Sequence, residues 1–325
     1  MRVAVDAMGG DYAPAEVVAG AALAGDEYGI ETLLVGDEAL IGKEISGQNS
    51  SRISVVPARE VIGMAEHPVK AVRLKKGSSI VRAVQLVKDG RADAMVSAGN
   101  TGAVMTAALW GLGRLDGIDR PALFSLMPNP HGSTVLLDVG ANVDVKAQHL
   151  VQFAIMGSAY ATSVLKIRSP RVGILSIGEE ETKGNELTLS ALPLLKSEPI
   201  NFIGNVEGRD VFNGRADVVV CDGFVGNVLL KAGEGLVQVL QTAYPALRRL
   251  DYAEYGGAPL LGVSGVVVVA HGSSRARAVK NAIRVAVEAV ESGLVQATAA
   301  GFAARNTKEV AHAALGTTKG ENMDP

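Results

Sequence analysis

Short apolar runs alternate along the chain with longer segments in which apolar residues recur at helical spacing. The short runs have the length and β-branched content of buried strands, and the longer segments are typical of helices with one buried face. This alternation predicts an α/β protein with a mainly parallel sheet that helices cover on both faces. The predicted strands are 2–7, 32–36, 53–57, 94–96, 121–127, 134–139, 171–177, 201–204, 218–221 and 265–270.

The predicted helices begin and end at ordinary signals in the sequence. Pro14 is favoured in a first helical turn, whereas Pro245 is expected to break or kink the helix over 231–250. The glycine-rich segment 252–262 is predicted to be irregular, and the tail 305–325 loses its periodicity and is predicted to be mobile. The predicted helices are 14–28, 37–45, 68–76, 78–88, 101–113, 146–165, 186–196, 231–250 and 275–291.

Two stretches of the chain are nearly the same. Residues 90–105 read GRADAMVSAGNTGAVM and residues 214–229 read GRADVVVCDGFVGNVL, so eight of sixteen positions are identical. Each copy predicts a strand, a Gly-x-x-Gly turn and a helix. Such a turn directs backbone N–H groups to the space beyond the strand, where an anion can bind at the positive end of the helix. Reuse of strand–turn–helix units in a parallel α/β fold explains the shared Gly-Arg-Ala-Asp start equally well.

Polar, glycine-containing loops follow six of the predicted strands. Ligands bind beyond the carboxyl ends of parallel strands, so we expect these loops to line one cleft. The four aspartates of these loops could together hold Mg²⁺, but an aspartate at the end of a strand is more often a helix or turn cap, and we predict no metal site. The residues predicted to bind substrate or phosphate are Asp6, Gly9, Gly10, Asp11, Ser97, Asn100, Thr101, Asp138, Asn142, Asn185, Glu186, Asp222, Gly223 and Ser273.

Composition and charge exclude several classes of protein. The 325 residues are 48% apolar and 20% charged, which is typical of a globular chain. A net charge of −3 gives no electrostatic reason to expect nucleic acid, and 4% aromatic residues argue against base stacking. With Cys221 as its lone cysteine the chain cannot form an internal disulfide, which fits a reducing cytoplasm. Cys221 lies in an apolar predicted strand, so we expect its side chain to be buried. Arg2 leads directly into the first strand and no apolar run could span a bilayer, so we expect a cytoplasmic protein, soluble or peripheral to the inner membrane face.

The motifs of several familiar active sites are missing from the sequence. It contains no P-loop, no dinucleotide fingerprint and no nucleophilic serine elbow, and its histidines lack zinc-site spacing. The predicted cleft is rich in hydrogen-bond donors, which suits a substrate that brings its own nucleophile. Inorganic phosphate is such a substrate, because its oxyanion can attack a thioester carbonyl while Lys183 holds it and Asn227 stabilises the tetrahedral oxyanion. His271 is a candidate acid–base partner.

Eight motifs follow one another along the chain: MRVAVDAMGGD, SAGNTGA, DVGANVD, KGNELT, FIGNVEGRD, VVCDGFVGNV, YGGAPLLG and HGSS. Together they closely resemble the PlsX family, the phosphate acyltransferases of bacterial phospholipid synthesis, over residues 1–290. The resemblance implies a three-layer α/β/α fold similar to phosphate acetyltransferases and the isocitrate dehydrogenase group. It also implies a homodimer that needs no cofactor and transfers the acyl group of acyl-(acyl carrier protein) to inorganic phosphate.

The resemblance assigns roles to individual residues. The family's lysine in Lys-Gly-Asn and asparagine in Gly-Phe-x-Gly-Asn correspond to Lys183 and Asn227, the expected catalytic or phosphate-contacting pair. The acyl phosphate product is expected to feed a membrane acyltransferase that acylates glycerol 3-phosphate. Family members usually insert a longer apolar helical hairpin that contacts the membrane and the second subunit, whereas only 232–250 fill the gap here. We therefore expect weak membrane association and one catalytic domain over 1–304, with a shortened insertion at 232–262.

Carrier proteins of this kind are acidic, which makes basic residues candidates for docking. Arg275, Arg277 and Lys280 lie near the start of the last long predicted helix and are predicted to form the docking patch, together with Arg248 and Arg249. An ordinary solvated helix face explains the same charges equally well.

Two other functions remain open from the sequence. A metal-dependent decarboxylating dehydrogenase on the related fold would require a nucleotide fingerprint and an arginine cluster for a tricarboxylate, and neither is evident. A non-catalytic protein that binds acyl chains or phosphate as a scaffold is the third possibility. Release of the carrier's thiol that depends on phosphate distinguishes all three.

Overall fold

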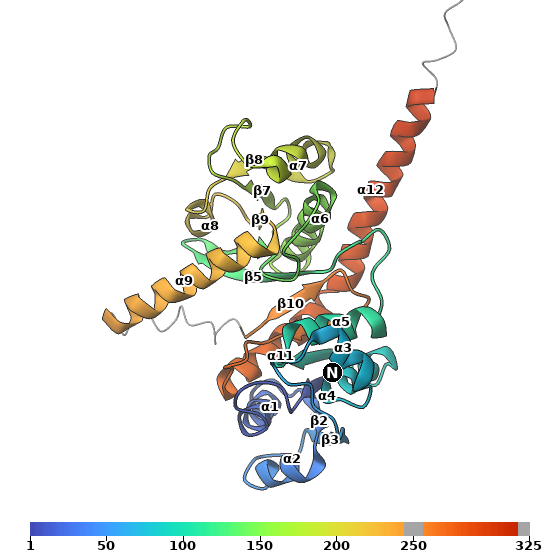
Figure 1. Cartoon of the computed structure of the whole chain (residues 1–325), viewed down its shortest axis with the longest axis vertical. Coiled ribbons are helices and arrows are strands. Elements are labelled where there is room, and N and C mark those ends of the chain that lie inside the picture. The colour runs from blue at the N-terminus through green and yellow to red at the C-terminus, as the bar shows by residue number, and fades with distance from the viewer. Residues whose placement is uncertain (244–255, 318–325) are drawn as a thin grey trace, which may run out of the picture.

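The computed structural model describes residues 1–243 and 256–317. In this part of the chain one sheet of 11 strands carries helices on both faces (Figure 1). The strands are β1 (Arg2–Asp6), β2 (Glu31–Gly36), β3 (Ile53–Pro57), β4 (Ala94–Ser97), β5 (Ala122–Asn129), β6 (Gly132–Leu137), β7 (Arg171–Leu175), β8 (Asn201–Val206), β9 (Val218–Val220), β10 (Ala258–Leu261) and β11 (Val266–Val269). The helices are α1 (Ala15–Tyr28), α2 (Glu38–Ile45), α3 (Pro68–Leu74), α4 (Ser79–Lys88), α5 (Thr101–Gly111), α6 (Ala147–Ser163), α7 (Glu186–Ser197), α8 (Asp210–Asn213), α9 (Gly223–Ala243), α11 (Ala276–Glu291) and α12 (Leu294–Thr317).

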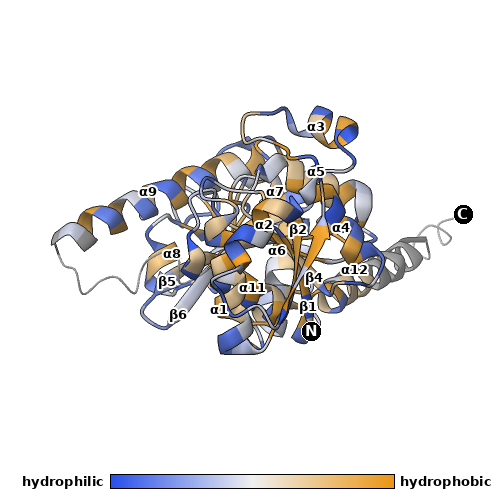
Figure 2. Ribbon diagram, turned by 90° about the horizontal axis from the view of Figure 1, so that it is seen from below, coloured by the Kyte–Doolittle hydropathy of each residue, from blue (hydrophilic) through white to orange (hydrophobic). Residues whose placement is uncertain are grey.

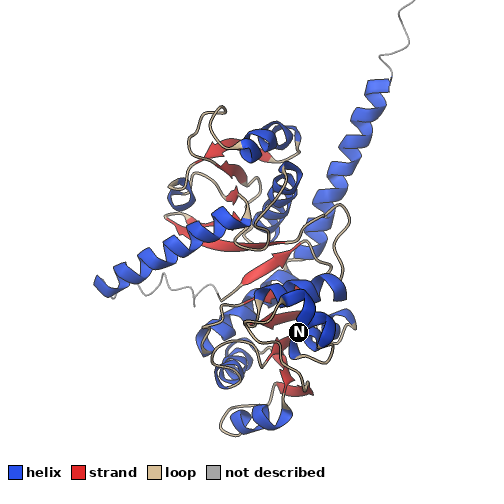
Figure 3. Ribbon diagram, viewed as in Figure 1, coloured by secondary structure: helices blue, strands red, loops and turns tan. Residues whose placement is uncertain are grey.

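The sheet consists of two parallel halves that run in opposite directions. Its strand order is β3-β2-β1-β4-β11-β10-β5-β6-β9-β7-β8. The strands from β3 to β11 are parallel to one another, and so are the strands from β6 to β8. Between them, β10 is antiparallel to β11 and β5, and β5 is antiparallel to β6. Figure 3 shows the two groups of strands joined through β10 and β5. The predicted, mainly parallel sheet is confirmed, but the carboxyl ends of its two halves lie at opposite edges of the ladder.

Strand β10 lies where the sequence predicts irregular structure. Gly256 and Gly257 precede it and Pro259 is its second residue, and all three residue types are signals of a chain break. The first two residues of β10 pair with β11, and the last two pair with β5. The prediction is wrong at 258–261, because pairing with two neighbouring strands overrides weak local propensity.

Two apolar clusters cover the two faces of the sheet. Val3 and Val5 of β1 belong to one cluster, with residues of α1, α6, α11 and α12, whereas Ala4 belongs to the other, with residues of α4 and α5. Alternate residues of a strand point to opposite faces, so the expected three-layer α/β/α arrangement is confirmed. Val172 extends the first cluster and Val219 the second into the other half of the sheet. Apolar strands accordingly lie in the interior of Figure 2, with hydrophilic segments outside.

The carboxyl-terminal part differs from the prediction. α11 is followed almost directly by α12, a helix that the sequence pattern did not indicate and that continues to Thr317. The first part of the predicted tail, up to Thr317, is therefore helical, while 318–325 lie outside the described residues. The described part of α9 ends at Ala243, so the predicted break at Pro245 also lies outside them.

Candidate functional site

At one edge of the sheet, the loops after β1, β4 and β11 lie against one another. Asp6 ends β1, and its Oδ2 accepts a hydrogen bond from the hydroxyl of Ser97 at the end of β4 (2.7 Å). The N–H of Asp11 donates to the carbonyl oxygen of Gly272, in the loop after β11 (2.8 Å). We call this cluster the first rim. It contains the predicted residues Asp6, Gly9, Gly10, Asp11, Ser97, Asn100, Thr101, His271 and Ser273.

The loop after β4 is fixed from both sides. A Cβ atom at Gly9 would lie 2.7 Å from the amide nitrogen of Gly99, so the two loops approach as closely as they do only with glycine at this position. The side chain of Asn100 accepts an N–H of the first turn of α5, and its Nδ2 donates to the carbonyl oxygens of Met64 and Glu66 (3.0 Å each). Asn100 thereby holds the segment before α3 over the first rim.

At the opposite edge, Asp138 follows β6 and is completely buried. Its Oδ1 accepts the N–H groups of Leu123 (3.1 Å) and Ala141 (3.0 Å), and its Oδ2 accepts the N–H (2.7 Å) and the side-chain amide (3.0 Å) of Asn142. The N–H of Gly223, the first residue of α9, donates to the carbonyl oxygen of Asn142 (2.7 Å). We call this second cluster the second rim. It contains the predicted residues Asp138, Asn142, Lys183, Asn185, Glu186, Asp222, Gly223 and Asn227.

The polar loops thus form two rims, since the carboxyl ends of the two halves of the sheet lie at opposite edges of the ladder. The predicted residues at the rims are of two kinds: some are buried and hold the loops together, and others are open to a ligand. Burial raises the pKa of the carboxyl groups of Asp6 and Asp138, and both are enclosed by donors of their own loops. This geometry fits the cap interpretation of these aspartates. The predicted ligand-binding residues that are buried and bonded to neighbouring loops are Asp6, Ser97, Asn100, Asp138 and Asn142.

Asn227 is exposed in the second turn of α9, above the loop after β6. A Cβ atom at Gly140 would lie 3.7 Å from its Cγ, so the amide side chain lies directly over this loop. Asp222 caps the helix by accepting the N–H of Val225 (2.9 Å). The strand–turn–helix units predicted by both copies of the repeat are confirmed as β4–α5 and β9–α9, and one copy lies in each half of the sheet.

Lys183 lies in the loop after β7, next to β9 in the same half of the sheet. Its side chain is exposed, while its carbonyl oxygen accepts hydrogen bonds from Nδ2 of Asn205 (3.1 Å) and Oγ of Ser176 (3.2 Å). Asn185 caps α7 by accepting the N–H of Thr188 (2.9 Å). Neighbouring side chains thus set the position of the Lys183 backbone, and the ammonium group is not needed to hold the loop. The sequence analysis did not identify Asn205 and Ser176, because no recognisable motif contains either residue together with Lys183.

One helix connects the two rims. α9 begins at the second rim, and Nζ of Lys231 on this helix lies 3.3 Å from Nε2 of His271 on the first rim. Nδ1 of His271 in turn lies 2.7 Å from Oγ of Ser273. From Gly223 to Lys231 is eight residues, which corresponds to about 12 Å of helix. The sequence analysis missed Lys231, although its spacing of four residues from Asn227 puts both side chains on one helix face.

Two of the predicted docking residues at the start of α11 already have acidic partners. Nη1 of Arg275 lies 3.1 Å from Oε1 of Glu16, and Nζ of Lys280 lies 2.6 Å from Oε2 of Glu27, both on α1. The hydrogen bond to Glu27 raises the pKa of the Lys280 ammonium group. The side chain of Lys280 is also largely buried, so the structure argues against a role for Lys280 in a docking patch. Arg277 is exposed, while the other two predicted residues, Arg248 and Arg249, lie outside the described residues.

The structure also bears on several other kinds of site. Within residues 1–243 and 256–317, His, Cys, Asp and Glu side chains form no group of three or more that could hold a metal ion. Burial raises the pKa of the Cys221 thiol well above its ordinary value, which makes it a poor nucleophile. None of the described helices is long and apolar enough to cross a membrane.

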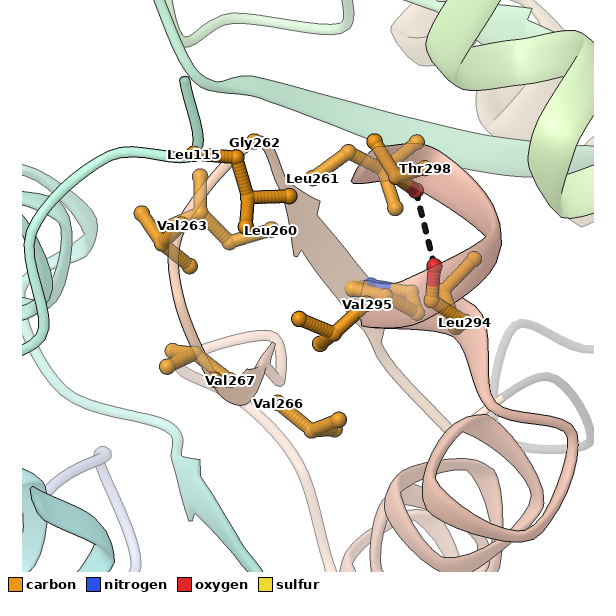
Figure 4. A pocket seen from close by; sticks show the side chains of 12 residues that line it. Leu115, Leu260, Leu261, Gly262, Val263, Val266, Val267, Leu294, Val295 and Thr298 are labelled. Atoms are coloured by element: carbon orange, nitrogen blue, oxygen red, sulfur yellow. Dashed lines mark hydrogen bonds between the residues drawn. The ribbon is translucent and has the colours of Figure 1, made fainter. Parts of the chain in front are cut away.

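A small apolar cavity lies between β10, β11 and the first turn of α12 (Figure 4). Leucine and valine side chains dominate its lining, and its volume is about 10 Å³. That is room for about one water molecule, so the cavity cannot hold an acyl chain.

Comparison with known proteins identifies the family. The sequence model described as "Fatty acid synthesis protein" matches residues 1–246 and 239–297. The chain is 58% identical over 319 residues to the phosphate acyltransferase of Pelotomaculum thermopropionicum, covering 91% of this chain and 93% of that protein. It is 55% identical over 324 residues to the phosphate acyltransferase of Desulforudis audaxviator, covering 93% and 96%.

Solved structures with this fold are much more distant in sequence. A phosphotransacetylase from Streptococcus pyogenes superimposes with a TM-score of 0.65 at 21% identity, covering 90% of this chain and 94% of that one. A branched-chain phosphotransacylase from Enterococcus faecalis gives 0.60 at 16% identity, covering 89% and 99%. These two similarities establish the fold, and the sequence relatives establish the family. The chain belongs to the phosphate acyltransferase family of fatty acid synthesis proteins and is an acyltransferase.

Proposed function

We propose that the protein transfers the acyl group of acyl-(acyl carrier protein) to inorganic phosphate, producing acyl phosphate and free carrier protein. The observation that carries this proposal is the chemistry of the exposed side chains at the rims. Asn227, Lys183 and His271 offer hydrogen-bond donors and positive charge, whereas the thiol of Cys221 is buried. A site of this kind suits a reaction in which phosphate itself is the nucleophile.

In the proposed reaction, a phosphate oxygen attacks the carbonyl carbon of the thioester and forms a carbon–oxygen bond. The carbon–sulfur bond then breaks, and its electron pair leaves with the sulfur as the carrier's thiolate. The ordinary pKa of a thiol is about 8.5, so the thiolate is a stable leaving group. The amide of Asn227 donates to the tetrahedral oxyanion, and the ammonium group of Lys183 offsets the charge of the phosphate or the oxyanion. No covalent bond to the protein is required.

The proposed product, an acyl phosphate, is an activated acyl donor. We propose that a membrane acyltransferase consumes it to acylate glycerol 3-phosphate in phospholipid synthesis. On the substrate side, an acidic carrier protein would approach an exposed cation such as Arg277.

We also propose that the protein acts as a homodimer through α9. Four apolar side chains of this helix recur at helical spacing and are exposed, which is typical of a face that a partner covers. Val228, Leu236 and Val239 have exposed fractions of 55%, 60% and 67%, and Val225 completes the face. We expect sedimentation velocity to show a dimer, and the double substitution of Leu236 and Val239 by arginine to show a monomer. A monomeric wild-type protein at micromolar concentration would refute this part of the proposal.

The transfer reaction is tested by following free carrier thiol with a long-chain acyl carrier protein as substrate. We expect thiol release that requires phosphate and yields one acyl phosphate for each thiol. The control omits phosphate and supplies sulfate at the same ionic strength. Equal release without phosphate would identify a thioesterase instead, and no release under either condition would leave only a binding protein.

A further inference from the structure

We propose that α3 and the residues next to it form the docking surface for the acidic carrier protein. The inference deepens the proposed transfer reaction, on which it rests, because it says where on this chain the carrier binds. We call this surface the α3 patch. Its members are the exposed basic residues Lys70, Arg73 and Lys76 and the exposed apolar residues Met64, Val69 and Leu74.

The segment around α3 has the opposite charge to the chain as a whole. Residues 59–76 contain five lysines and arginines and two glutamates, a net charge of +3, whereas the complete chain has a net charge of −3. Both glutamates already have local partners. Oε1 of Glu66 lies 2.6 Å from Nζ of Lys75, and Oε2 of Glu60 accepts the N–H of Gly77 (2.8 Å). The segment therefore attracts an acidic partner, although the net charge of the protein repels one.

The basic side chains of the α3 patch have no acidic neighbours to neutralise them. Lys70, Arg73 and Lys76 are exposed and form no ion pair within the described part of the chain. The helix against which α3 packs, α5, contains no charged residue. At the start of α11, by contrast, two of the predicted docking residues pair with glutamates of α1. The α3 patch is accordingly the better electrostatic match for an acidic carrier.

Exposed apolar side chains lie among these charges. Ala71 and Val72 are the buried residues of α3, while Lys70 and Leu74 are one turn apart and share its outer face. Leu74 has an exposed fraction of 68% and Met64 one of 51%. Figure 2 shows α3 at the periphery of the molecule, with hydrophilic and hydrophobic residues side by side. Exposed apolar side chains together with arginine and methionine are typical of protein–protein interfaces.

The α3 patch also lies beside the first rim. Nδ2 of Asn100 donates to the carbonyl oxygen of Met64 (3.0 Å), and a Cβ atom at Gly272 would lie 3.2 Å from Cε of Met64. Met64 thus lies over the loop that contains His271. Because α3 is seven residues long, which corresponds to about 10 Å, a carrier protein that binds the patch is next to this rim.

The double charge reversal of Lys70 and Arg73 to glutamate tests the patch in the transfer assay. We expect the KM for the acyl carrier protein to rise about 10-fold or more and kcat to stay within about 3-fold of wild type, because these side chains contact the carrier and not the reacting atoms. With the acyl thioester of N-acetylcysteamine, which has no carrier protein, kcat/KM should stay within about 2-fold of wild type. The wild-type KM for the carrier substrate should rise with salt more steeply than that of the variant.

The matched control is the double charge reversal of Lys88 and Arg91 to glutamate. Lys88 ends α4 and Arg91 lies between α4 and β4, so both exposed residues are at the opposite end of β4 from the first rim. This control changes the net charge by the same amount, and we expect a KM within about 2-fold of wild type. Equal effects of the two charge reversals would show that only the total charge matters and would overturn the proposal.

Binding measured without turnover separates this inference from the proposed function. Fluorescently labelled acyl carrier protein is titrated with the protein in the absence of phosphate and followed by anisotropy. We expect the charge reversal of Lys70 and Arg73 to raise Kd about 10-fold or more, and Leu74→Ser, which removes no charge, to raise it about 3- to 10-fold. Unchanged Kd and KM in these variants would overturn the docking surface and leave the transfer reaction standing. Carrier binding that depends on the α3 patch, without acyl transfer, would refute the reaction and leave the surface standing.

Two further outcomes would also overturn the proposal. Anionic lipids attract the same charges, so the variants are sedimented with vesicles of phosphatidylcholine and phosphatidylglycerol. If the charge reversal on α3 releases the protein from these vesicles and leaves carrier binding unchanged, the patch binds membranes. If Arg277→Glu weakens carrier binding and the charge reversal on α3 does not, the carrier docks at α11.

Discussion

Substituting alanine for Lys183 is expected to lower turnover by about two to three orders of magnitude, the loss typical of removing one group that stabilises transition-state charge. The exposed ammonium group of Lys183 forms no hydrogen bond or ion pair with another predicted site residue in the described part of the chain. Its backbone is held by Asn205 and Ser176. The variant should therefore fold normally and lose catalysis alone. Phosphate-dependent release of the carrier's thiol, measured as kcat and KM, checks this result.

Lys196 offers a matched control in the same region. It pairs with Glu181 of the Lys183 loop (Nζ to Oε1, 2.5 Å) and lies in the last turn of α7. Lys196→Ala removes the same charge from the same part of the surface, and we expect turnover within about 2-fold of wild type. Near-normal turnover in Lys183→Ala, or equal losses in both variants, would show that Lys183 is only one of several surface charges.

Replacing Asp138 by alanine is expected to lower the free energy of unfolding by about 3 to 5 kcal/mol. Its carboxylate accepts four hydrogen bonds inside the protein, from Leu123, Ala141 and Asn142. Without it, these buried donors lose their acceptor, and the loop after β6 loses one of its hydrogen bonds to the start of β5. Urea unfolding at neutral pH, followed by circular dichroism, measures the loss.

The side chain of Asp37 provides the comparison, because it also accepts two backbone N–H groups but does so at the exposed start of α2. Asp37→Ala should cost only about 1 kcal/mol, since water can replace the lost acceptor. Asp138→Asn gives a second test. One amide oxygen can replace one carboxylate oxygen, but the NH₂ group then faces donors, so an intermediate loss is expected. Equal losses at positions 37 and 138 would contradict a structural role for the Asp138 network.

Much of the fold follows from local signals in the chain. The apolar runs predict ten of the strands, and capping residues such as Asn185 mark helix starts where the structure has them. The repeat likewise predicts β4–α5 and β9–α9, because strand, turn and helix preferences act over a few neighbouring residues. The sequence did not predict β10, since Pro259 is a poor strand former and two glycines precede the strand, and only pairing with β11 and β5 makes 258–261 a strand.

The candidate site was predicted less completely. Loop composition proposed His271 and the second-rim residue Asn227, which are exposed, but the same reasoning included Asp6 and Asp138, which are buried. Burial depends on which loops lie against one another, and a loop's own residues do not reveal its neighbours. Lys231 was missed for the same reason, because its contact with His271 joins positions that are 40 residues apart.

The sequence by itself determined the secondary structure, the layered α/β architecture and the membership in an acyltransferase family, because each depends on short-range preferences or on ordered motifs. Only the tertiary structure decided where the polar loops lie. β10 is antiparallel to both neighbours and so leaves β11 and β5 parallel to each other, and the antiparallel pair β5–β6 then reverses the direction of the sheet and places the loops on two rims. The direction of a strand is set by backbone hydrogen bonds to its partners, and these leave no pattern in the strand's own residues. Helix α9 then brings the two rims back into contact.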